Sequence, residues 1–580
     1  MSHTTMSIRT QQLLGAALLA LCAPLARSAA PDAGAVLRQL EAQPSGRLLA
    51  PRLQTPQEPS PPAADHSGPV VRVNAFRLDG LSLLSEKTVQ DALRGFTGRE
   101  LNFTQLQEAA WVVVQTARDA GWLLSAFVPQ QEIEGGVITL RVVEARLGDV
   151  RISGADAPEM GKLLAHIQAM ARDHVRSGDA INLRQIDRLL LLIDDLPGVT
   201  ASASFAEGRR AGSTDMLIQL GPDKAMDTSI VFDNHGAIFI GANRLTTSVS
   251  LNNPAGLGDA LQLQALVSDG SRYGRVAWSL PVGLQGARAG VHASDMQYHL
   301  VGSFADLQAQ GTAQTWGIDL SAPLVRQPER NLSWQLSTDR KRLINRALAN
   351  AQTSETTPVS QYHIDLLRTG LSGNWFDQLL SPAQNTSSVQ ASWGNVHLGE
   401  SPNASADASA ANTAGAFYKL NANYNREQSL STSLTWYVQA SAQWANRNLD
   451  SSEKLYLGGA SGVRAYPANE AGGSTGSIAT TGLRLRLDQG LSLNSFLDWG
   501  RIHVYRHNLS ATGTELANPN VQSLQGYGLS LNWRLPQGHE LAATWSRRQG
   551  SNPAANTTTG ADSDGTRTLH RLWLSAALNF

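Results

Sequence analysis

The sequence predicts a membrane-embedded all-β barrel of about sixteen antiparallel strands, preceded by two small α/β units. Three observations support this. The last residues alternate between apolar and other side chains up to Phe580. Residues 225–580 are rich in Ser, Thr, Asn, Gln, Gly and Ala, with apolar residues at alternate positions. Residues 70–224 show the order β-α-α-β-β twice, which is typical of compact α/β units rather than of a barrel.

Composition limits the function classes. The 580 residues are enough for several domains, and a charged fraction of 16% with a net charge of -1 argues against nucleic-acid binding. The single cysteine, Cys22, excludes disulfides and a thiolate metal site. We find no His-Glu-x-x-His, no phosphate loop and no nucleophile elbow. The chain is therefore predicted to be no enzyme, with no cofactor and no metal; an outer-membrane lipase or protease is the enzymatic alternative.

Residues 1–30 are predicted to be a secretory signal peptide. Arg9 precedes a short apolar run at 13–21, and small residues at Ala26–Ala30 suit cleavage. Lipidation of Cys22 is an alternative, but Leu21 is large for the preceding position. No later stretch reaches the roughly 18 apolar residues of a membrane helix. An exported chain with a lipid-facing terminal strand is expected in a bacterial outer membrane, with its N-terminal domains in the periplasm.

A short helix is predicted at residues 31–43. Asp32 suits the N-cap, and Val36, Leu37 and Leu40 form a narrow apolar stripe. A Pro-rich linker follows at 44–69, long enough for the helix to lie away from the next domain. The helix is a candidate plug for a barrel lumen about as wide as a helix. A disordered tail is the alternative.

The two α/β units are predicted at 70–146 and 147–224. In the first, a strand beginning at Val71 is followed by a helix at 85–96 and a second helix opening at Thr104, with Gln107 completing a capping box. Strands separated by Gly135 and Gly136 complete the unit. In the second unit, helices are expected at 158–174 and 183–196, and strands at 200–205 and 214–220.

The barrel is predicted to occupy 225–580. Its candidate strands lie near residues 228, 245, 262, 276, 290, 315, 335, 364, 390, 420, 436, 480, 496, 527, 542 and 574. The last strand is expected to close the barrel, with one lipid-facing side made by Leu572, Leu574, Leu578 and Phe580. An ordinary edge strand of a soluble sheet is the alternative.

One loop and one strand carry the most specific motifs. The loop motif is Gly462, Val463, Arg464, Ala465 and Tyr466, and the strand motif is Phe496, Asp498 and Gly500. A desolvated guanidinium inside a barrel needs a carboxylate partner, so we expect Arg464 to pair with Asp498. Phe496 is expected on the same side of the strand, and Leu497 toward lipid.

These motifs resemble the VRG(F/Y) loop and F-x-D strand of the superfamily that contains the BAM-complex barrel and the two-partner secretion transporters, the TpsB proteins. The repeated α/β units are similar to POTRA domains. Two such repeats and an N-terminal helix favour the TpsB family of haemolysin and adhesin secretion proteins. Ala465 stands where the motif usually has Gly; because Ala tolerates positive φ poorly, a differently shaped loop tip is expected.

The resemblance implies an outer-membrane transporter that binds an unfolded TpsA-type partner through its POTRA domains and exports it through the barrel. The partner would be a large secreted haemolysin, adhesin or contact-dependent toxin. The implied environment is outer-membrane lipid, with insertion by the barrel-assembly machinery, no nucleic acid and a monomeric state. The alternatives are an assembly factor that inserts other barrels, a passive porin and a surface adhesin.

Overall fold

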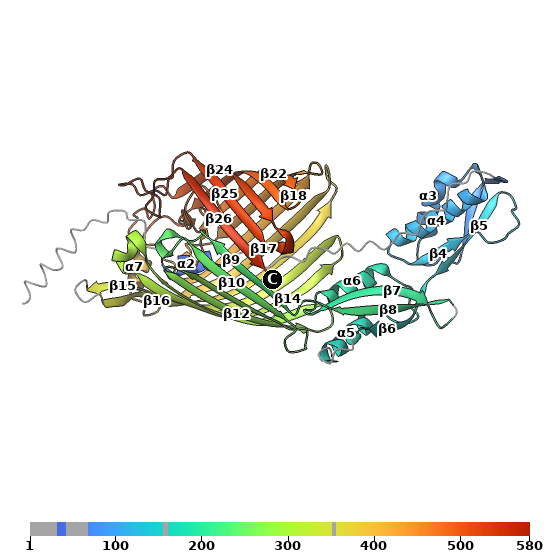
Figure 1. Ribbon diagram of the computed structural model, residues 1–580, viewed down its shortest axis with the longest axis horizontal. Helices are drawn as coiled ribbons and strands as arrows, with labels where there is room; N and C mark the ends of the chain where they lie inside the picture. Colours follow the sequence, from blue (N-terminus) through green and yellow to red (C-terminus); the bar gives the residue numbers. More distant parts are fainter. Residues whose placement is uncertain (1–31, 42–67, 155–160, 211, 351–354) are drawn as a thin grey trace, which may run out of the picture.

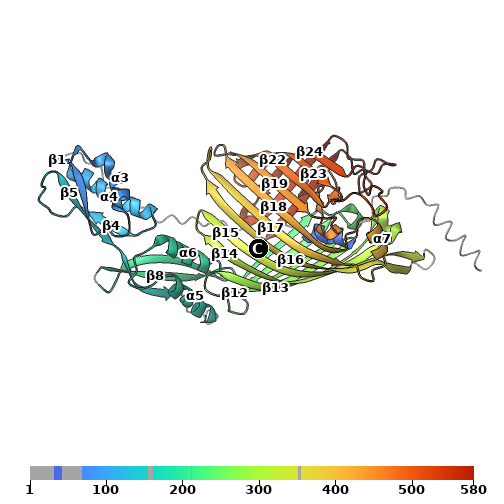
Figure 2. The same ribbon diagram turned by 180° about the vertical axis from the view of Figure 1, so that it is seen from behind.

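The computed structural model describes residues 32–41, 68–154, 161–210, 212–350 and 355–580. The predicted signal peptide with Cys22, and all but the last residues of the predicted Pro-rich linker, lie outside the described residues. A barrel forms one part of the molecule, and two α/β units lie beyond one of its ends (Figures 1 and 2). Among the described residues, no helix combines the length and apolar character needed to span a bilayer.

The first unit contains a three-stranded sheet of order β2-β5-β4, with β2 parallel to β5. Its elements are β1 (Val71–Val73), β2 (Ala75–Asp79), α3 (Glu86–Leu93), η1 (Arg94–Phe96), β3 (Arg99–Leu101), α4 (Phe103–Asp119), β4 (Leu124–Phe127) and β5 (Val137–Glu144). The expected first strand is split, because β1 pairs with β3 while β2 pairs with β5.

The capping box of α4 differs from the prediction. Asn102 is the N-cap, its side chain accepts from the backbone N–H of Gln105, and the Gln105 side chain accepts from the backbone N–H of Asn102. The pair Thr104 and Gln107 is therefore wrong by two residues. Asn caps a helix as well as Ser or Thr does, and placing it there lets the helix begin at Phe103.

The second unit repeats the arrangement with sheet order β6-β8-β7, and β6 parallel to β8. Its elements are β6 (Arg146–Ser153), α5 (Gly161–His174), α6 (Leu183–Asp194), β7 (Val199–Glu207) and β8 (Ser213–Pro222). Leu189, Leu192 and Ile193 of α6 are buried with Ile167 and Met170 of α5. Each unit thus has its own apolar core between helices and sheet.

The barrel closes with sixteen antiparallel strands, confirming the predicted fold class. They are β9 (Met226–Asp233), β10 (Arg244–Asn252), β11 (Ala260–Ser268), β12 (Ser271–Val282), β13 (Ala287–His299), β14 (Gln310–Arg326), β15 (Arg330–Asn350), β16 (Glu355–Asp377), β17 (Ala383–His397), β18 (Gly415–Ser429), β19 (Leu434–Ala445), β22 (Thr475–Asp488), β23 (Leu491–His503), β24 (Val521–Arg534), β25 (Glu540–Gln549) and β26 (His570–Asn579). Every strand pairs with its neighbour in the chain, and β26 pairs with β9.

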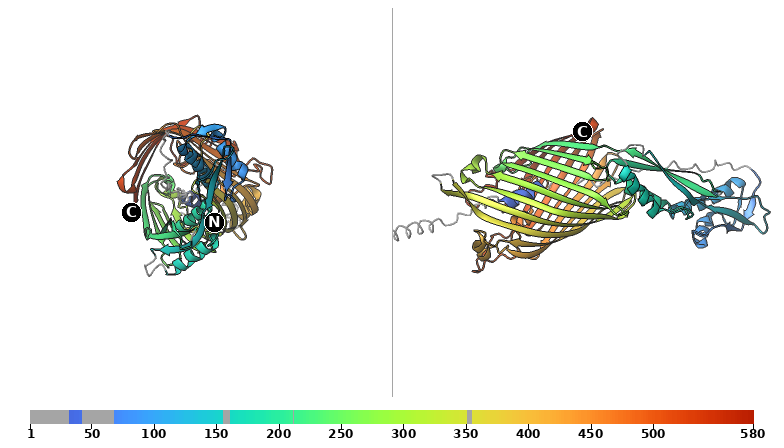
Figure 3. Two further views of the ribbon diagram at one scale, coloured as in Figure 1. Left: turned by 90° about the vertical axis from the view of Figure 1, so that its right-hand side faces the viewer. Right: turned by 90° about the horizontal axis from the view of Figure 1, so that it is seen from below.

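Shorter elements lie in the connections between barrel strands. They are η3 (Ile238–Ile240), η4 (Gly302–Leu307), α7 (Ala404–Ser409), η5 (Ser451–Glu453), β20 (Leu455–Tyr456), β21 (Gly472–Gly473) and η6 (Pro536–Gly538). The turns next to the α/β units are short, whereas several connections at the opposite end, such as 446–474 and 550–569, are long. An N-terminal helix, α2 (Ala33–Glu41), lies inside the barrel, nearer that opposite end (Figure 3).

Candidate functional site: the occupied lumen

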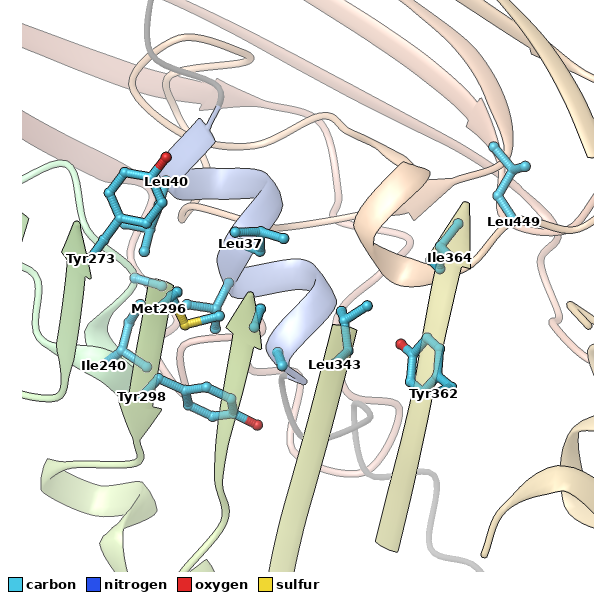
Figure 4. Close-up of a cluster of buried hydrophobic side chains, with 14 of the residues drawn as sticks. Leu37, Leu40, Ile240, Tyr273, Met296, Tyr298, Leu343, Tyr362, Ile364 and Leu449 are labelled. Atoms are coloured by element: carbon cyan, nitrogen blue, oxygen red, sulfur yellow. The ribbon is translucent and has the colours of Figure 1, made fainter. Parts of the chain in front are cut away.

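The helix α2 fills part of the lumen. Its side chains Val36 and Leu37 are fully buried and Leu40 is 2% exposed. They belong to a cluster, called here the lumen cluster, in which wall residues from several strands surround the helix (Figure 4); its labelled members include Tyr273, Met296, Tyr298, Leu343, Tyr362 and Ile364. The lumen of a porin is polar. Here the wall residues packed on Val36, Leu37 and Leu40 are apolar, so this face of the helix is packed as in a protein core.

Polar contacts fix the start of α2. The backbone N–H of Ala33 donates to Asn345 Oδ1 on β15 at 2.7 Å. The Ser451 hydroxyl of η5 donates to Asp32 Oδ1 at 2.6 Å. Between them, Gly34 lies so close to η5 that an added Cβ would be 2.3 Å from Ser451 Oγ. The helix is thus held between the barrel wall and the connection that carries η5.

That connection, residues 446–474 between β19 and β22, carries the loop motif into the barrel. Arg464 donates from Nη2 to Asp498 Oδ1 at 2.6 Å and from Nε to Asp498 Oδ2 at 2.9 Å. The Thr480 hydroxyl donates to the same carboxylate at 2.8 Å. The guanidinium lies 3.3 Å from the centre of the Phe496 ring. The Asp498 side chain is fully buried, so these partners take the place of water around the carboxylate.

Two glycines on the wall make room for the loop. A Cβ at Gly500 on β23 would lie 3.1 Å from Val463 Cγ2, and a Cβ at Gly526 on β24 would lie 2.6 Å from Ala465 Cβ. Phe496, Asp498 and Gly500 therefore face the loop from successive inward positions of β23. Ala465 is absent from the described residues with positive φ. The absence of a side chain at Gly526 leaves room for the methyl group of Ala465.

The same loop contacts the last two strands. The Arg464 carbonyl accepts from the Ser546 hydroxyl on β25 at 2.7 Å and from Trp573 Nε1 on β26 at 2.8 Å. Tyr466 is fully buried, and the Arg548 guanidinium of β25 lies 4.6 Å from its ring centre. The motif thus touches the wall from β23 to β26, and it occupies the side of the lumen across from the strands that pack on α2.

A buried ion cluster links the 446–474 connection to α2 and to the wall. Glu453 of η5 pairs with Lys419 on β18 at 2.6 Å and with Lys341 on β15 at 3.1 Å, and Arg368 on β16 lies 3.6 Å away. Lys341 also contacts Glu41 at the end of α2 at 3.3 Å. The side chains of Glu453 and both lysines are at most 3% exposed. We call these five residues the Glu453 cluster.

The second α/β unit contacts the nearby end of the barrel. Asp195, which follows α6, accepts from the guanidinium of Arg326 at the end of β14, at 2.7 and 2.8 Å. Leu284 in the β12–β13 turn packs on the unit's apolar core. A Cβ at Gly286 of the same turn would lie 2.5 Å from a Leu192 methyl group. This interface is therefore both apolar and ionic.

The structure brings together the two predicted motifs and places the candidate plug beside the connection that carries one of them. The closing-strand residues lie apart from both, on the outer wall: Leu572, Leu574 and Phe580 are 54%, 46% and 62% exposed. The sequence reasoning did not identify the Glu453 cluster or the Asp195–Arg326 pair. The Glu453 cluster could have been predicted from the rule that a lysine pointing into the barrel needs a carboxylate partner.

The chain matches known protein families and curated relatives. The profile of the family described as haemolysin secretion/activation protein ShlB/FhaC/HecB matches residues 212–533. The ShlB-type POTRA domain profile matches residues 71–145. The heme/hemopexin transporter protein HuxB of Haemophilus influenzae is 25% identical over 564 residues, which cover 95% of each chain. The outer membrane transporter CdiB of Escherichia coli is 24% identical over 484 residues, covering 79% of this chain and 77% of CdiB.

Solved structures agree on the fold. CdiB from Escherichia coli matches with a TM-score of 0.63 at 19% identity, covering all of both chains. BamA from Haemophilus ducreyi lacking POTRA domains 1–3 matches with a TM-score of 0.52 at 13% identity, covering 88% of this chain and all of that truncated chain.

Together, the barrel, the N-terminal POTRA domains and these relatives define an outer-membrane β-barrel transporter of two-partner secretion. The chain belongs to the ShlB/FhaC/HecB family of haemolysin secretion/activation proteins, the TpsB family. This is a transporter family and not an enzyme family, as predicted. Membership implies a secreted TpsA-type partner protein. It also decides against the assembly-factor alternative, which shares the barrel fold.

Proposed function

We propose that α2 is a plug that closes the export path and leaves the lumen when the partner protein passes. The observation that carries this is the complete burial of Val36 and Leu37, with Leu40 nearly buried, in the lumen cluster. Burying one such side chain contributes about 1.5–3 kcal/mol. The same helix occupies space that an extended chain would need, so closure and export exclude each other.

Release of α2 also changes its conformation. A helix of nine residues is marginal in water, because isolated helices need about 12–15 residues even with favourable composition. The helical form therefore depends on packing in the lumen. Release ends both the packing and the helix, so the plug switches between a docked helix and a flexible segment.

The loop motif holds the rest of the lumen in shape. Arg464 and Asp498 tie the 446–474 connection to β23, and the Arg464 carbonyl ties it to β25 and β26. The same connection presents Ser451 to α2. Breaking one partner of a buried ion pair costs about 3–5 kcal/mol. Loss of the pair would then disturb both the lumen wall and the seat of the plug.

The partner is proposed to be a large secreted protein, a haemolysin, an adhesin or a contact-dependent toxin, that arrives unfolded. Strands β4 and β7 lie at the edges of the two POTRA sheets, and each exposes a phenylalanine: Phe127 is 46% exposed and Phe205 is 39% exposed. An extended segment of the partner would add to such an edge, with backbone hydrogen bonds for affinity and the aromatic ring for an apolar contact.

In the outer membrane, the barrel is proposed to act as a single copy. The outward leucines of β26 suit contact with outer-membrane lipid. Insertion of the barrel into that membrane would use the barrel-assembly machinery. Because the closed barrel has no free strand edge, it is proposed to act as a monomer.

The experiment compares the full chain with a variant lacking residues 32–41. Ion conductance is measured in planar bilayers, and release of the partner encoded beside this gene is measured in cells. We expect a large rise in conductance and retained export, because the deletion removes the obstruction and keeps the POTRA domains. Unchanged conductance would show that α2 does not close the lumen. Raised conductance with lost export would show that α2 serves the partner in another way.

A further inference from the structure

Three side chains that can bind a metal ion lie together on the barrel, apart from the lumen. His363 and Asp365 belong to β16, and His397 ends β17; their candidate ligand atoms all lie within 4.8 Å of one another. His363 and His397 are directly paired in the strand ladder. Their rings stack with centres 4.4 Å apart and planes inclined by 15°. The pairing of the two strands therefore brings two imidazoles and one carboxylate together.

The ligand atoms converge on one carboxylate oxygen. Asp365 Oδ2 lies 3.4 Å from His397 Nε2 and 4.0 Å from His363 Nε2. Bonds from Zn²⁺ to imidazole nitrogen or carboxylate oxygen are about 2.0–2.2 Å long. Two atoms bound to the same ion can thus be separated by up to about 4 Å. The two separations from Asp365 Oδ2 fit ligands of a single ion. The candidate ligand atoms of the two imidazoles lie within 4.8 Å of each other, so binding one ion requires side-chain rotation that brings these nitrogens to about 4 Å or less.

The carboxylate is held in place by Arg340 of β15. Its Nε donates to Asp365 Oδ1 at 2.5 Å and its Nη2 donates to Asp365 Oδ2 at 2.9 Å. A carboxylate has about four lone-pair positions, so Oδ2 can accept this bond and still bind a metal. Hydrogen bonds to a ligating carboxylate are the usual outer shell of a metal site. The guanidinium also lies 5.9 Å from the centre of the Trp316 ring, which limits its movement.

The charged residues around the site affect which cations can bind there. The positive charge of Arg340 opposes any cation, and so does that of Arg342, which is paired with His363 in the β15–β16 ladder. Mg²⁺ and Ca²⁺ bind mainly through charge to oxygen ligands, whereas Zn²⁺, Cu²⁺ and Ni²⁺ bind imidazole well. Two imidazoles with only one carboxylate therefore favour a transition-metal ion.

The site faces outward near the end of the barrel opposite the POTRA domains. On β16, Ile364 and Leu366 are buried in the lumen cluster, so the alternate residues His363 and Asp365 point to the outside. The next outward position toward the middle of β16 is Leu367, which is 46% exposed. The site thus lies just beyond the apolar, lipid-facing residues of β16. All three of its side chains are half-buried. An ion can reach it without entering the lumen.

We propose that His363, Asp365 and His397 form a binding site for a divalent transition-metal ion, with Zn²⁺ as the expected occupant, on the outer rim of the barrel. The ion would connect β16 to β17. Three protein ligands leave a coordination position for water. The proposal is independent of the plug, because none of these residues belongs to the lumen cluster.

The test titrates Zn²⁺ into the full chain in detergent, without a polyhistidine tag and after chelator treatment, by calorimetry. We expect one ion per chain, and no comparable binding of Mg²⁺. His363→Ala and His397→Ala should each weaken binding by at least about tenfold, since losing even an outer-shell partner costs roughly 10–100-fold. The matched control is His299→Ala, an exposed histidine at the end of β13 outside the site, which should bind Zn²⁺ as the parent does.

A second measurement identifies the ligands directly. Electron paramagnetic resonance of the Cu²⁺ form should show two coordinated nitrogens in the parent chain and one in His397→Ala. Circular dichroism of each variant establishes that the barrel is folded. Equal Zn²⁺ affinity in the folded parent and in a folded His363→Ala/His397→Ala variant would overturn the proposal, and so would absence of Zn²⁺ binding by the parent.

Discussion

Replacing Leu37 by alanine is expected to open the lumen by weakening the docking of α2. The Leu37 side chain is fully buried in the lumen cluster. Replacing a buried leucine by alanine costs about 2–5 kcal/mol, through lost burial and the cavity that remains. Alanine is at least as good a helix former as leucine, so the helix itself is not weakened.

The effect on docking is then large. A factor of ten corresponds to about 1.4 kcal/mol, so the ratio of docked to released α2 should fall by roughly 30-fold to 3,000-fold. The assay is the open probability of single channels formed by the purified full chain in planar bilayers. The expected result is a clear rise in open probability, with an open conductance equal to that of the variant lacking residues 32–41.

The matched control is Arg38→Ala. Arg38 is half-buried, directly follows Leu37 in α2 and, among the described residues, forms no side-chain hydrogen bond or ion pair. Its replacement should leave the open probability nearly unchanged. The reasoning would be refuted if Leu37→Ala gated like the parent while the deletion variant stayed open. Equal opening by both substitutions would also refute it, because packing would then not be the force that holds the helix.

Three further predictions concern the loop and the POTRA interface. Arg464→Ala should strongly reduce partner export while the barrel still inserts, because the Asp498 carboxylate loses its buried partner at a cost of about 3–5 kcal/mol; export and membrane-fraction immunoblots check this, and normal export would contradict it. Gly526→Ala should lower the thermal unfolding temperature, since its Cβ would lie 2.6 Å from Ala465 Cβ, and adding Ala465→Gly should restore much of the loss; no rescue would show that the contact is not the cause. Arg326→Ala should increase hydrogen exchange in α6 and in the adjoining barrel turns, because the second POTRA domain loses its ion pair to the barrel; unchanged exchange would mean that apolar packing alone holds the interface.

Much of the barrel could be predicted because its signal is local. Period-two alternation runs along many of the strands, so sixteen strand positions follow from the sequence and the structure has a strand at each. The loop and strand motifs were found because glycine, arginine and aspartate stand out in a segment poor in charge. The space for the Ala465 methyl group could not be predicted, because it comes from Gly526, which is distant in the sequence.

The Glu453 cluster shows what could not be predicted. Glu453, Lys341 and Lys419 come from η5, β15 and β18. Only closure of the barrel brings the two ammonium groups to 3.1 Å and 2.6 Å from the Glu453 carboxylate. Each residue alone is compatible with a solvated loop or strand end. The same holds for Asp195, which follows α6 and pairs with Arg326 at the end of β14. Such contacts depend on the register between strands and on domain placement, which alternation does not determine.

The apolar wall around α2 has a consequence for the speed of export. Once the helix has left, side chains such as Met296, Leu343 and Ile364 form an apolar strip along one side of the lumen. Apolar segments of the passenger would dwell on this strip, about tenfold longer for each 1.4 kcal/mol of burial gained, while polar segments would pass without that delay. The hydropathy of the passenger's own sequence would therefore determine where export pauses.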